Sequence, residues 1–481
     1  MYRKNLIKKI KAKKMKNKFL KLFVWMLLVC FTFTDMAPAY AGGQAADPSV
    51  KNDPANKALK EDDNGELIYD AVDNAKPTDG AFTLADCYAK ALVQSETIAI
   101  NEDMIKVTEA HFLQALSIML PHVSYLSDDF QQDASCKTNG SSFQPKSSGR
   151  AFNMTETLFS GFKAFAAIQG STYEKDQRIQ EKIRAEQLLF VDVSNSFYLL
   201  LEKRDDLKAL YRVKKALISR IEELEAREKL GRSRTSEVVN AKVQLYNTIA
   251  LIENVKNQEV VARQLLEFLV GGPVGELDDV YSLPYNLQPE EFYVAKSEQR
   301  PDIKAAKYAW ELSKKNIVVV ESDFLPTVSL DSNAYTNRSG SYKGIDWDVM
   351  LAVKVPIFEG TEVIGKSKEA RLQAHESELT YQRTKRHAPY DIRESYTSLN
   401  TAITVARELK NALDAARENF MLQKKDYELS LVSNLEVLTA IQLLRDAERN
   451  YIHALYEAKR LYWQLRVSVG DNVKESLNDI I

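Results

Sequence analysis

The residues of this 481-residue chain that could do chemistry are scattered rather than clustered. Metal sites need His, Cys or carboxylate ligands at short spacings, and hydrolase or nucleotide sites need a nucleophile motif or a glycine-rich phosphate loop. The sequence contains none of these motifs, and acidic neighbours such as Asp128-Asp129 are common on solvated faces. The histidines share no ligand spacing: His111, His122, His375, His387 and His453. We therefore predict no catalytic residue, no cofactor and no metal, and we do not expect an enzyme.

The amino terminus has the three-part layout of a secretory signal peptide. Residues 1–18 are rich in Lys and Arg, residues 19–33 are apolar, and Ala39-Tyr40-Ala41 forms a small-x-small cleavage site; either Met1 or Met15 could be the start. Removing residues 1–41 leaves a net charge of about −11, which argues against nucleic acid as a partner. No later apolar run reaches the roughly 20 residues of a transmembrane helix. The sequence predicts an exported protein.

The rest of the chain contains two copies of one unit. Thr157-Leu158-Phe159-Ser160-Gly161 recurs as Pro356-Ile357-Phe358-Glu359-Gly360 at an offset of 199 residues, and Leu120-Pro121 recurs as Leu325-Pro326 at an offset of 205. The difference between the offsets places a longer insert in the first copy, between the Leu-Pro and Phe-x-Gly landmarks. A repeat with one variable loop indicates a duplicated scaffold.

The repeat and the composition together predict the domain organisation. Residues 42–80 are polar with few apolar positions, which is typical of a flexible segment. A second linker contains Pro273, Pro284 and Pro289 among acidic residues. The predicted order is a signal peptide (1–41), a flexible segment (42–80), a first repeat (81–272, hairpin about 121–159), a linker (273–290), a second repeat (291–471, hairpin about 326–358) and a tail (472–481).

Each repeat has the same predicted succession of elements. A helical stretch (84–119, and about 297–324) ends at the Leu-Pro pair, a β-hairpin follows, and 70 residues with helical spacing then separate Gly161 from Gly231 and Gly360 from Ser430. That stretch is about 105 Å long as one helix, so two shorter helices stacked end to end could lie beside it. Pro389 lies inside the second long stretch and predicts a kink.

The returning strand of the second hairpin has the clearest alternation. This pattern is ambiguous, because it fits a half-buried strand of a soluble sheet as well as a barrel strand with lipid on one side and water on the other. Four strands cannot close a membrane barrel, and open edges are prohibitive in lipid, so insertion would require several chains. The predicted membrane-facing residues are Trp347, Val349, Leu351, Val353 and Val355, which alternate with Asp348, Met350, Ala352 and Lys354.

Taken in order, these landmarks resemble the TolC-like outer-membrane efflux protein family over about residues 82–471. Arg300-Pro301-Asp302-Ile303 at the start of the second repeat adds to the resemblance. The resemblance implies a mainly α fold with membrane β-strands, in a homotrimer with a 12-stranded β-barrel continued by a periplasmic α-helical barrel. It also implies a passive exit duct in the outer-membrane lipid, which works with a periplasmic adaptor protein and an inner-membrane pump.

Two helix turns are similar to the family's tunnel tips, where adaptors make contact. Hydroxyl or amide residues there, Thr235 or Ser236 and Ser433 or Asn434, could equally be helix N-caps, which explains these residue types without a partner. The residues assigned to adaptor contact by the resemblance are Leu230, Gly231, Thr235, Glu237 and Val238 in the first turn, and Ser430, Leu431, Asn434 and Val437 in the second.

The resemblance also assigns a tunnel constriction to the second tip. Glu436 occupies the first carboxylate position of the family's pair, Thr439 replaces the second, and Tyr427 matches a Tyr of the surrounding network. Val432 stands where that network has an Arg. A ring of three Glu436 carboxylates in a trimer would attract cations, whereas a solvated Glu on a helix face is the alternative.

The same architecture bears on the cysteines of the mature chain. Cys87 begins the first helix and Cys136 lies in the first hairpin loop, so about 90 Å separates them. A disulfide requires Cα atoms within about 7 Å, so we predict two free thiols.

Two alternatives share much of this pattern. A periplasmic adaptor or coiled-coil scaffold would also be exported and helical, but it would lack alternating strands at matched positions of both repeats. A duct dedicated to type I protein secretion would share the fold entirely, because substrate choice resides mostly in the pump.

Overall fold

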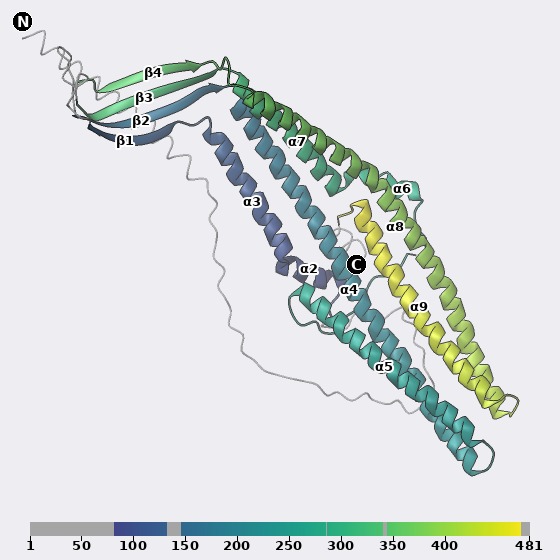
Figure 1. The fold of residues 1–481 in the computed structure, drawn as a ribbon. Helices are drawn as coiled ribbons and strands as arrows, with labels where there is room; N and C mark the ends of the chain where they lie inside the picture. Colours follow the sequence, from purple (N-terminus) through teal and green to yellow (C-terminus); the bar gives the residue numbers. More distant parts are fainter. Residues whose placement is uncertain (1–80, 132–145, 285, 340–343, 473–481) are drawn as a thin grey trace, which may run out of the picture. The chain divides into compact units, whose positions relative to one another are not determined.

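The computed structural model describes residues 81–131, 146–284, 286–339 and 344–472, which belong to one compact unit (Figure 1). The predicted signal peptide (1–41), the flexible segment (42–80), Cys136 and almost all of the tail (472–481) lie outside the described residues.

The first repeat folds into four helices and two strands. Figure 1 shows α3 and α5 following one another along the long helix α4. This is the predicted end-to-end arrangement of short helices beside a long one. The elements are α2 (Leu84–Gln94), α3 (Glu96–Ser117), β1 (His122–Gln131), β2 (Lys146–Ser160), α4 (Lys163–Lys229) and α5 (Thr235–Val270).

The second repeat also has four helices and two strands, together with two 3₁₀ turns. Its long helix α8 and final helix α9 have 67 and 36 residues, the same lengths as α4 and α5. Pro389 lies inside α8, which continues through it. The elements are α6 (Glu290–Val294), the 3₁₀ turn η1 (Ser297–Gln299), α7 (Pro301–Glu321), the 3₁₀ turn η2 (Ser322–Phe324), β3 (Thr327–Arg338), β4 (Trp347–Lys354), α8 (Glu362–Glu428) and α9 (Asn434–Val469).

One predicted helix is in fact two. The stretch 84–119 breaks at Ser95, whose backbone N–H donates to Ala91 O at 2.9 Å and ends α2. The Ser95 hydroxyl then accepts from the Ile98 N–H at 3.4 Å and begins α3. A side chain that caps a following helix competes with helix continuation, which explains the break.

The four strands form one antiparallel sheet in the order β1-β2-β3-β4. The central ladder joins the repeats, with Asn153 opposite Asn333 and Thr155 opposite Asp331. Within the described residues β1 pairs only with β2 and β4 only with β3, so the sheet has two edges. β4 ends at Lys354, so Val355 lies just beyond the strand to which the sequence assigned it.

The largest buried side chain, Trp463, lies near the C-terminal end of α9 and joins the two repeats. Its indole N–H donates to the Tyr198 hydroxyl of α4 at 3.1 Å, and its ring packs edge-on against Phe190 and Tyr281 with centroids 5.2 Å apart. Buried aromatic groups of this kind dominate core energetics, and the indole N–H needs the partner it has found.

Buried ion pairs continue this contact between α4 and α9. Asp206 accepts two hydrogen bonds from Arg449, at 2.7 and 3.0 Å, and Glu202 accepts one from Arg460 at 2.9 Å. Burial raises the pKa of Glu202, but hydrogen bonds and charge from Lys203 and Arg460 outweigh it and hold that pKa below its usual range. Glu202 therefore stays charged, and removing its cationic partners would leave an uncompensated buried charge.

Among the described helices, none combines the length and the apolar character that crossing a bilayer demands.

The buried thiol of Cys87 gives a first prediction. Cys87 is fully buried and free, and burial, together with the charge of Asp86, raises its pKa to about 12. Because the thiolate is the reactive form, a maleimide should leave Cys87 unmodified in the native protein at pH 8. In denaturant without reductant, two thiols should titrate in the mature chain. A count of zero would mean that Cys87 and Cys136 are joined, and it would contradict the separation predicted from the sequence.

Candidate functional site

The first helix turn is a Schellman motif, in which two backbone N–H groups bond back to carbonyls of the ending helix. The N–H of Arg232 donates to Arg227 O and that of Gly231 donates to Glu228 O, both at 2.8 Å. Gly231 has φ of +69°, in the left-handed region where glycine has no steric penalty. The turn between α4 and α5 is therefore defined by backbone geometry.

The second turn is the same motif with a serine in the strained position. The N–H of Leu431 donates to Asp426 O at 2.9 Å and that of Ser430 donates to Tyr427 O at 3.0 Å. Ser430 has φ of +59°. A left-handed conformation costs an L-residue about 1–2 kcal/mol, so the second tip is the more strained of the two.

The structure divides the predicted adaptor-contact residues into exposed and buried sets. Leu230 and Leu431 at the two turns are 71% and 70% exposed, unusual for leucine. Val238, Asn434 and Val437 are buried in the chain, so in this conformation they offer no surface to a partner. The sequence could not separate these sets, because both lie within a few residues of the turns.

The helix caps differ from the predicted ones at the first tip. The N-cap position of α5 is Arg234, without a side-chain cap, and the Thr235 hydroxyl instead donates to a Glu228 carboxylate oxygen at 2.5 Å. Glu237 accepts from the Ser233 hydroxyl at 2.7 Å. Thr235 and Glu237 therefore stabilise the turn, one by a hydrogen bond to α4 and the other by a hydrogen bond to Ser233 in the turn.

At the second tip, Ser433 is the N-cap of α9 and Glu436 completes a capping box. The Glu436 carboxylate accepts from the Ser433 N–H at 2.6 Å and from its hydroxyl at 3.0 Å. Glu436 and Thr439 both lie on the exposed side of α9. Ser433, one of the two predicted N-caps, is therefore the cap of α9, and Glu436 belongs to that cap while remaining exposed.

A buried arginine that the sequence reasoning missed connects the tip helices. Arg220 of α4 is 6% exposed; its Nε donates to Asn434 Oδ1 at 3.0 Å and its Nη1 donates to Glu223 at 2.7 Å. Its guanidinium lies 3.6 Å from the ring centroid of Tyr427. Arg220 thus joins α4 to α8 and α9, and its Nη2 has no partner among the described residues.

Asn434 extends this connection to α5, because its side-chain N–H donates to Glu237 O at 3.5 Å. Arg220 thereby supplies the positive charge beside Tyr427 that Val432 does not. The signal was present in the sequence: Arg220 falls among Leu217, Ile221 and Leu224, at a position where helical spacing predicts an apolar residue. We call Arg220, Tyr427 and Asn434 the tip network.

The sheet has one apolar and one polar face. Trp347, Val349, Leu351 and Val353 are 43–61% exposed, an apolar row that nothing in the described chain covers. On the opposite face a ladder of polar groups crosses three strands: Asn153 donates to Asn333 and Asn333 donates to Asp348, both at 2.9 Å. An exposed apolar face opposite a hydrogen-bonded polar one is the pattern of a strand between lipid and water.

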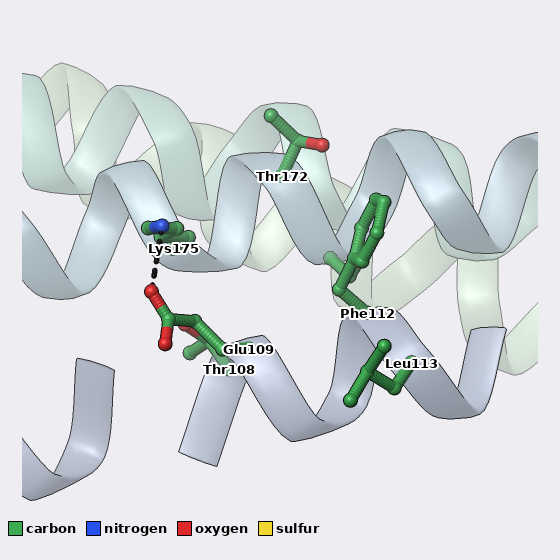
Figure 2. A pocket seen from close by; sticks show the side chains of 7 residues that line it. Thr108, Glu109, Phe112, Leu113, Thr172 and Lys175 are labelled. Atoms are coloured by element: carbon green, nitrogen blue, oxygen red, sulfur yellow. Dashed lines mark hydrogen bonds and ion pairs between the residues drawn. The ribbon is translucent and has the colours of Figure 1, made fainter. Parts of the chain in front are cut away.

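A cavity of about 430 Å³ lies between α3 and α4 (Figure 2). Figure 2 shows Glu109 and Lys175 facing each other from the two helices, and their charged groups are 2.8 Å apart. The hydroxyls of Thr108 and Thr172 donate to backbone carbonyls of their own helices. With these groups already engaged, the cavity lacks the convergent polar groups typical of a ligand site.

Within the described ranges, no group of three or more His, Cys, Asp or Glu side chains is placed to hold a metal ion.

Comparison with known proteins agrees with this geometry. The model of the outer membrane efflux protein family matches residues 294–471, most of the second repeat. The outer membrane protein TolC of Vibrio cholerae is 20% identical over 308 residues, 61% of this chain and 70% of that protein. The alkaline protease secretion protein AprF of Pseudomonas aeruginosa is 24% identical over 232 residues, 46% of this chain and 48% of that protein.

The outer membrane protein VceC of Vibrio cholerae has the same fold, with a TM-score of 0.70 at 18% identity over 81% of this chain and 96% of that one. The chain therefore has the fold of a solved outer membrane protein. The particular resemblance predicted from the sequence motifs, to the TolC-like outer-membrane efflux protein family, is confirmed.

The two tip turns give a second prediction, read as hydrogen exchange of their amides. Ser430→Gly relieves left-handed strain and should slow exchange at the second tip, whereas Gly231→Ala introduces strain and should speed exchange at the first. Each effect should be about two- to fivefold, which corresponds to about 0.5–1 kcal/mol. Gly365→Ala, within α8 and with open space around it, is the control and should change neither tip. Effects of the same sign at both tips would contradict the strain assignment.

Proposed function

We propose that this chain is an outer-membrane exit channel that passively conducts substrates from an inner-membrane pump and adaptor to the cell exterior. The observation that carries the proposal is a four-stranded sheet with an exposed apolar face, placed at one end of two repeated pairs of 67- and 36-residue helices. The family match over the second repeat and the TolC and AprF relatives support it.

The channel is proposed to be a homotrimer with a 12-stranded barrel. Four strands per chain leave β1 and β4 as edges, and in hydrocarbon every backbone group must be paired. Three copies bring 12 strands, an even number within the range of bacterial barrels. The apolar row of β4 would then face outer-membrane lipid and the Asn153-Asn333-Asp348 ladder would face the water-filled interior.

Exposed apolar side chains on the helices support side-by-side packing of the copies. Large exposed patches on a soluble surface mark interaction sites. Such residues recur along α5 and α8, the helices that would continue the barrel below the membrane. They include Val239, Val243, Tyr246, Val261, Leu265 and Phe268 on α5, and Leu372, Leu379, Val405, Met421 and Leu422 on α8.

The partners proposed for the tips are a periplasmic adaptor and, through it, an inner-membrane pump. Exposed Leu230 and Leu431 are the residues best placed for such a contact. The sheet argues against the alternative of an adaptor or scaffold, since a helical hairpin protein has no use for it. AprF is named for alkaline protease secretion, so type I secretion is a second candidate process besides efflux. A deletion strain tested for detergent sensitivity and for loss of secreted proteins would separate these two.

The tip network is proposed to hold the tunnel in a closed conformation. It ties the second hairpin, α8 and α9, to the first hairpin, α4 and α5, and opening would require these ties to separate. Glu436 and Thr439 lie next to it on the exposed side of α9, where three copies would form the narrowest ring.

Arg220→Met tests this closure. It removes the bond to Asn434 and the contact with Tyr427, and the loss of one buried hydrogen bond costs about 1–3 kcal/mol. Single-channel conductance in planar bilayers should rise. Lys215→Met, an exposed cation of the same helix, is the matched control and should leave conductance unchanged. Equal conductance of the Arg220 variant and the wild type would refute the closing role.

Glu436→Gln tests both the channel and its constriction. Glutamine can keep the capping contact with Ser433, so α9 should still begin at the same place. The ring of charge is lost, so block of the conductance by divalent cations should weaken. Glu418→Gln, an equal charge change on an exposed site of α8, should leave block intact. Purified protein that forms no pores at all would contradict the proposed function itself.

A further inference from the structure

A cavity of about 450 Å³ lies where the sheet meets the helices, and we call it the junction cavity. It is formed by the turn from β2 into α4, the end of α7 and the first turns of α8. In this region α7 lies between α4 and α8 (Figure 1). The volume is within the range of small-molecule pockets. The two tip turns are at the opposite end of the long helices, so the junction cavity is separate from the tip network.

The junction cavity opens on the apolar face of the sheet. Phe159 lies opposite Val328, and Val328 lies opposite Val353, so the three side chains share that face. The ring of Phe162 packs edge-on against Phe159 with centroids 5.4 Å apart, and Phe162 lines the cavity. The apolar face therefore continues from the sheet into the cavity.

The end of the junction cavity nearest the sheet is apolar and exposed. Phe162, Phe324 and Leu325 line it and are 58%, 48% and 40% exposed. Phe162 has φ of +69°, a strained conformation for a bulky residue. Such strain persists only where the surrounding structure holds it, and it is frequent at ligand contacts. Neighbouring large apolar side chains left in solvent mark an interaction surface.

The other end of the junction cavity carries an ion pair. Glu321 is the last residue of α7, and Arg371 lies about 14 Å along α8 from Glu362. Glu321 Oε1 accepts from the Ser367 hydroxyl at 2.9 Å and from Arg371 Nε and Nη2 at 3.0 and 2.6 Å. All three bonds use one carboxylate oxygen. Among the described residues, Glu321 Oε2 and Arg371 Nη1 therefore remain available to a ligand.

The order of these groups matches a phospholipid of the membrane leaflet nearer the helices. Its acyl chains would point toward the sheet and its headgroup toward the water around the helices. A headgroup with a phosphate and an ammonium offers an acceptor to Arg371 Nη1 and a donor to Glu321 Oε2, as charge-assisted hydrogen bonds. A headgroup with a phosphate alone would leave Glu321 facing a second negative charge.

We propose that the junction cavity binds one zwitterionic phospholipid, with an acyl chain against Phe162, Phe324 and Leu325 and the headgroup at Glu321 and Arg371. The inference rests on the proposed outer-membrane channel and adds a specific lipid site to the general lipid contact of β4. The cavity adjoins the ladder between β2 and β3, in the middle of the sheet. Neighbouring copies would meet at β1 and β4, so they would leave the cavity open to lipid.

Native mass spectrometry tests the site by counting bound lipids. The mature protein is purified from outer membranes, freed of lipid in detergent and titrated with palmitoyl-oleoyl phosphatidylethanolamine or with phosphatidylglycerol of the same chains. We expect one tightly bound phosphatidylethanolamine per chain, with roughly fivefold weaker binding of phosphatidylglycerol, the upper range for a partly exposed ion pair.

Two variants test the two ends of the cavity. Arg371→Gln removes the contact with the phosphate, and Val318→Trp fills the cavity while keeping the ion pair; each should weaken phosphatidylethanolamine binding about fivefold. Lys368→Gln removes an exposed cation of α8 outside the cavity and is the matched control, which should bind as the wild type does. Pore formation in planar bilayers shows that each variant has assembled, and either assembled variant is sufficient for the test.

Equal binding of the two lipids, or unchanged phosphatidylethanolamine binding in an assembled Arg371 or Val318 variant, would overturn the lipid site. The channel proposal would then still stand, because the protein forms pores. A wild-type protein that forms no pores would instead overturn the channel proposal on which the site rests.

Discussion

Backbone hydrogen bonding in hydrocarbon is the constraint on which the rest of this structure depends. An unpaired N–H or C=O group costs several kcal/mol in lipid, so a sheet that enters a membrane must have no open edge. This chain supplies four strands, an exposed apolar face on β4 and two edges. Association of copies, the interior polar ladder and the continuation into paired helices all follow if that sheet is to enter a membrane.

Because the chain is an internal repeat, strands can pair between its two halves as well as between copies. Within the chain, β2 pairs with β3, and Gly161 lies against Leu325. In the proposed trimer, β4 of one copy would pair with β1 of the next. Below the sheet, Trp463 and the buried ion pairs of α4 and α9 fix the two repeats to each other, so each copy would enter the proposed assembly as one body. At the tips, the tip network lies beside a hydrophobic cluster that also joins the two repeats and includes Leu217, Val238 and Val437.

Sequence patterns predicted the long helices, the hairpins and both tip turns, because these depend on local periodicity and on glycine or proline at fixed places. They did not predict the break at Ser95, where a single hydroxyl decides between continuing a helix and capping the next one. Arg220 was missed because its partners, Tyr427 and Asn434, are more than 200 residues away in the sequence. The burial of Val238 and Val437 likewise depends on how four helices meet.

The central claim is that three copies complete one outer-membrane barrel. Its most direct test is native mass spectrometry of the mature protein extracted from outer membranes into nanodiscs, which counts the copies in each complex. The account predicts three copies and no stable monomer in the membrane fraction. A membrane-embedded monomer, or a complex with any other number of copies, would contradict it.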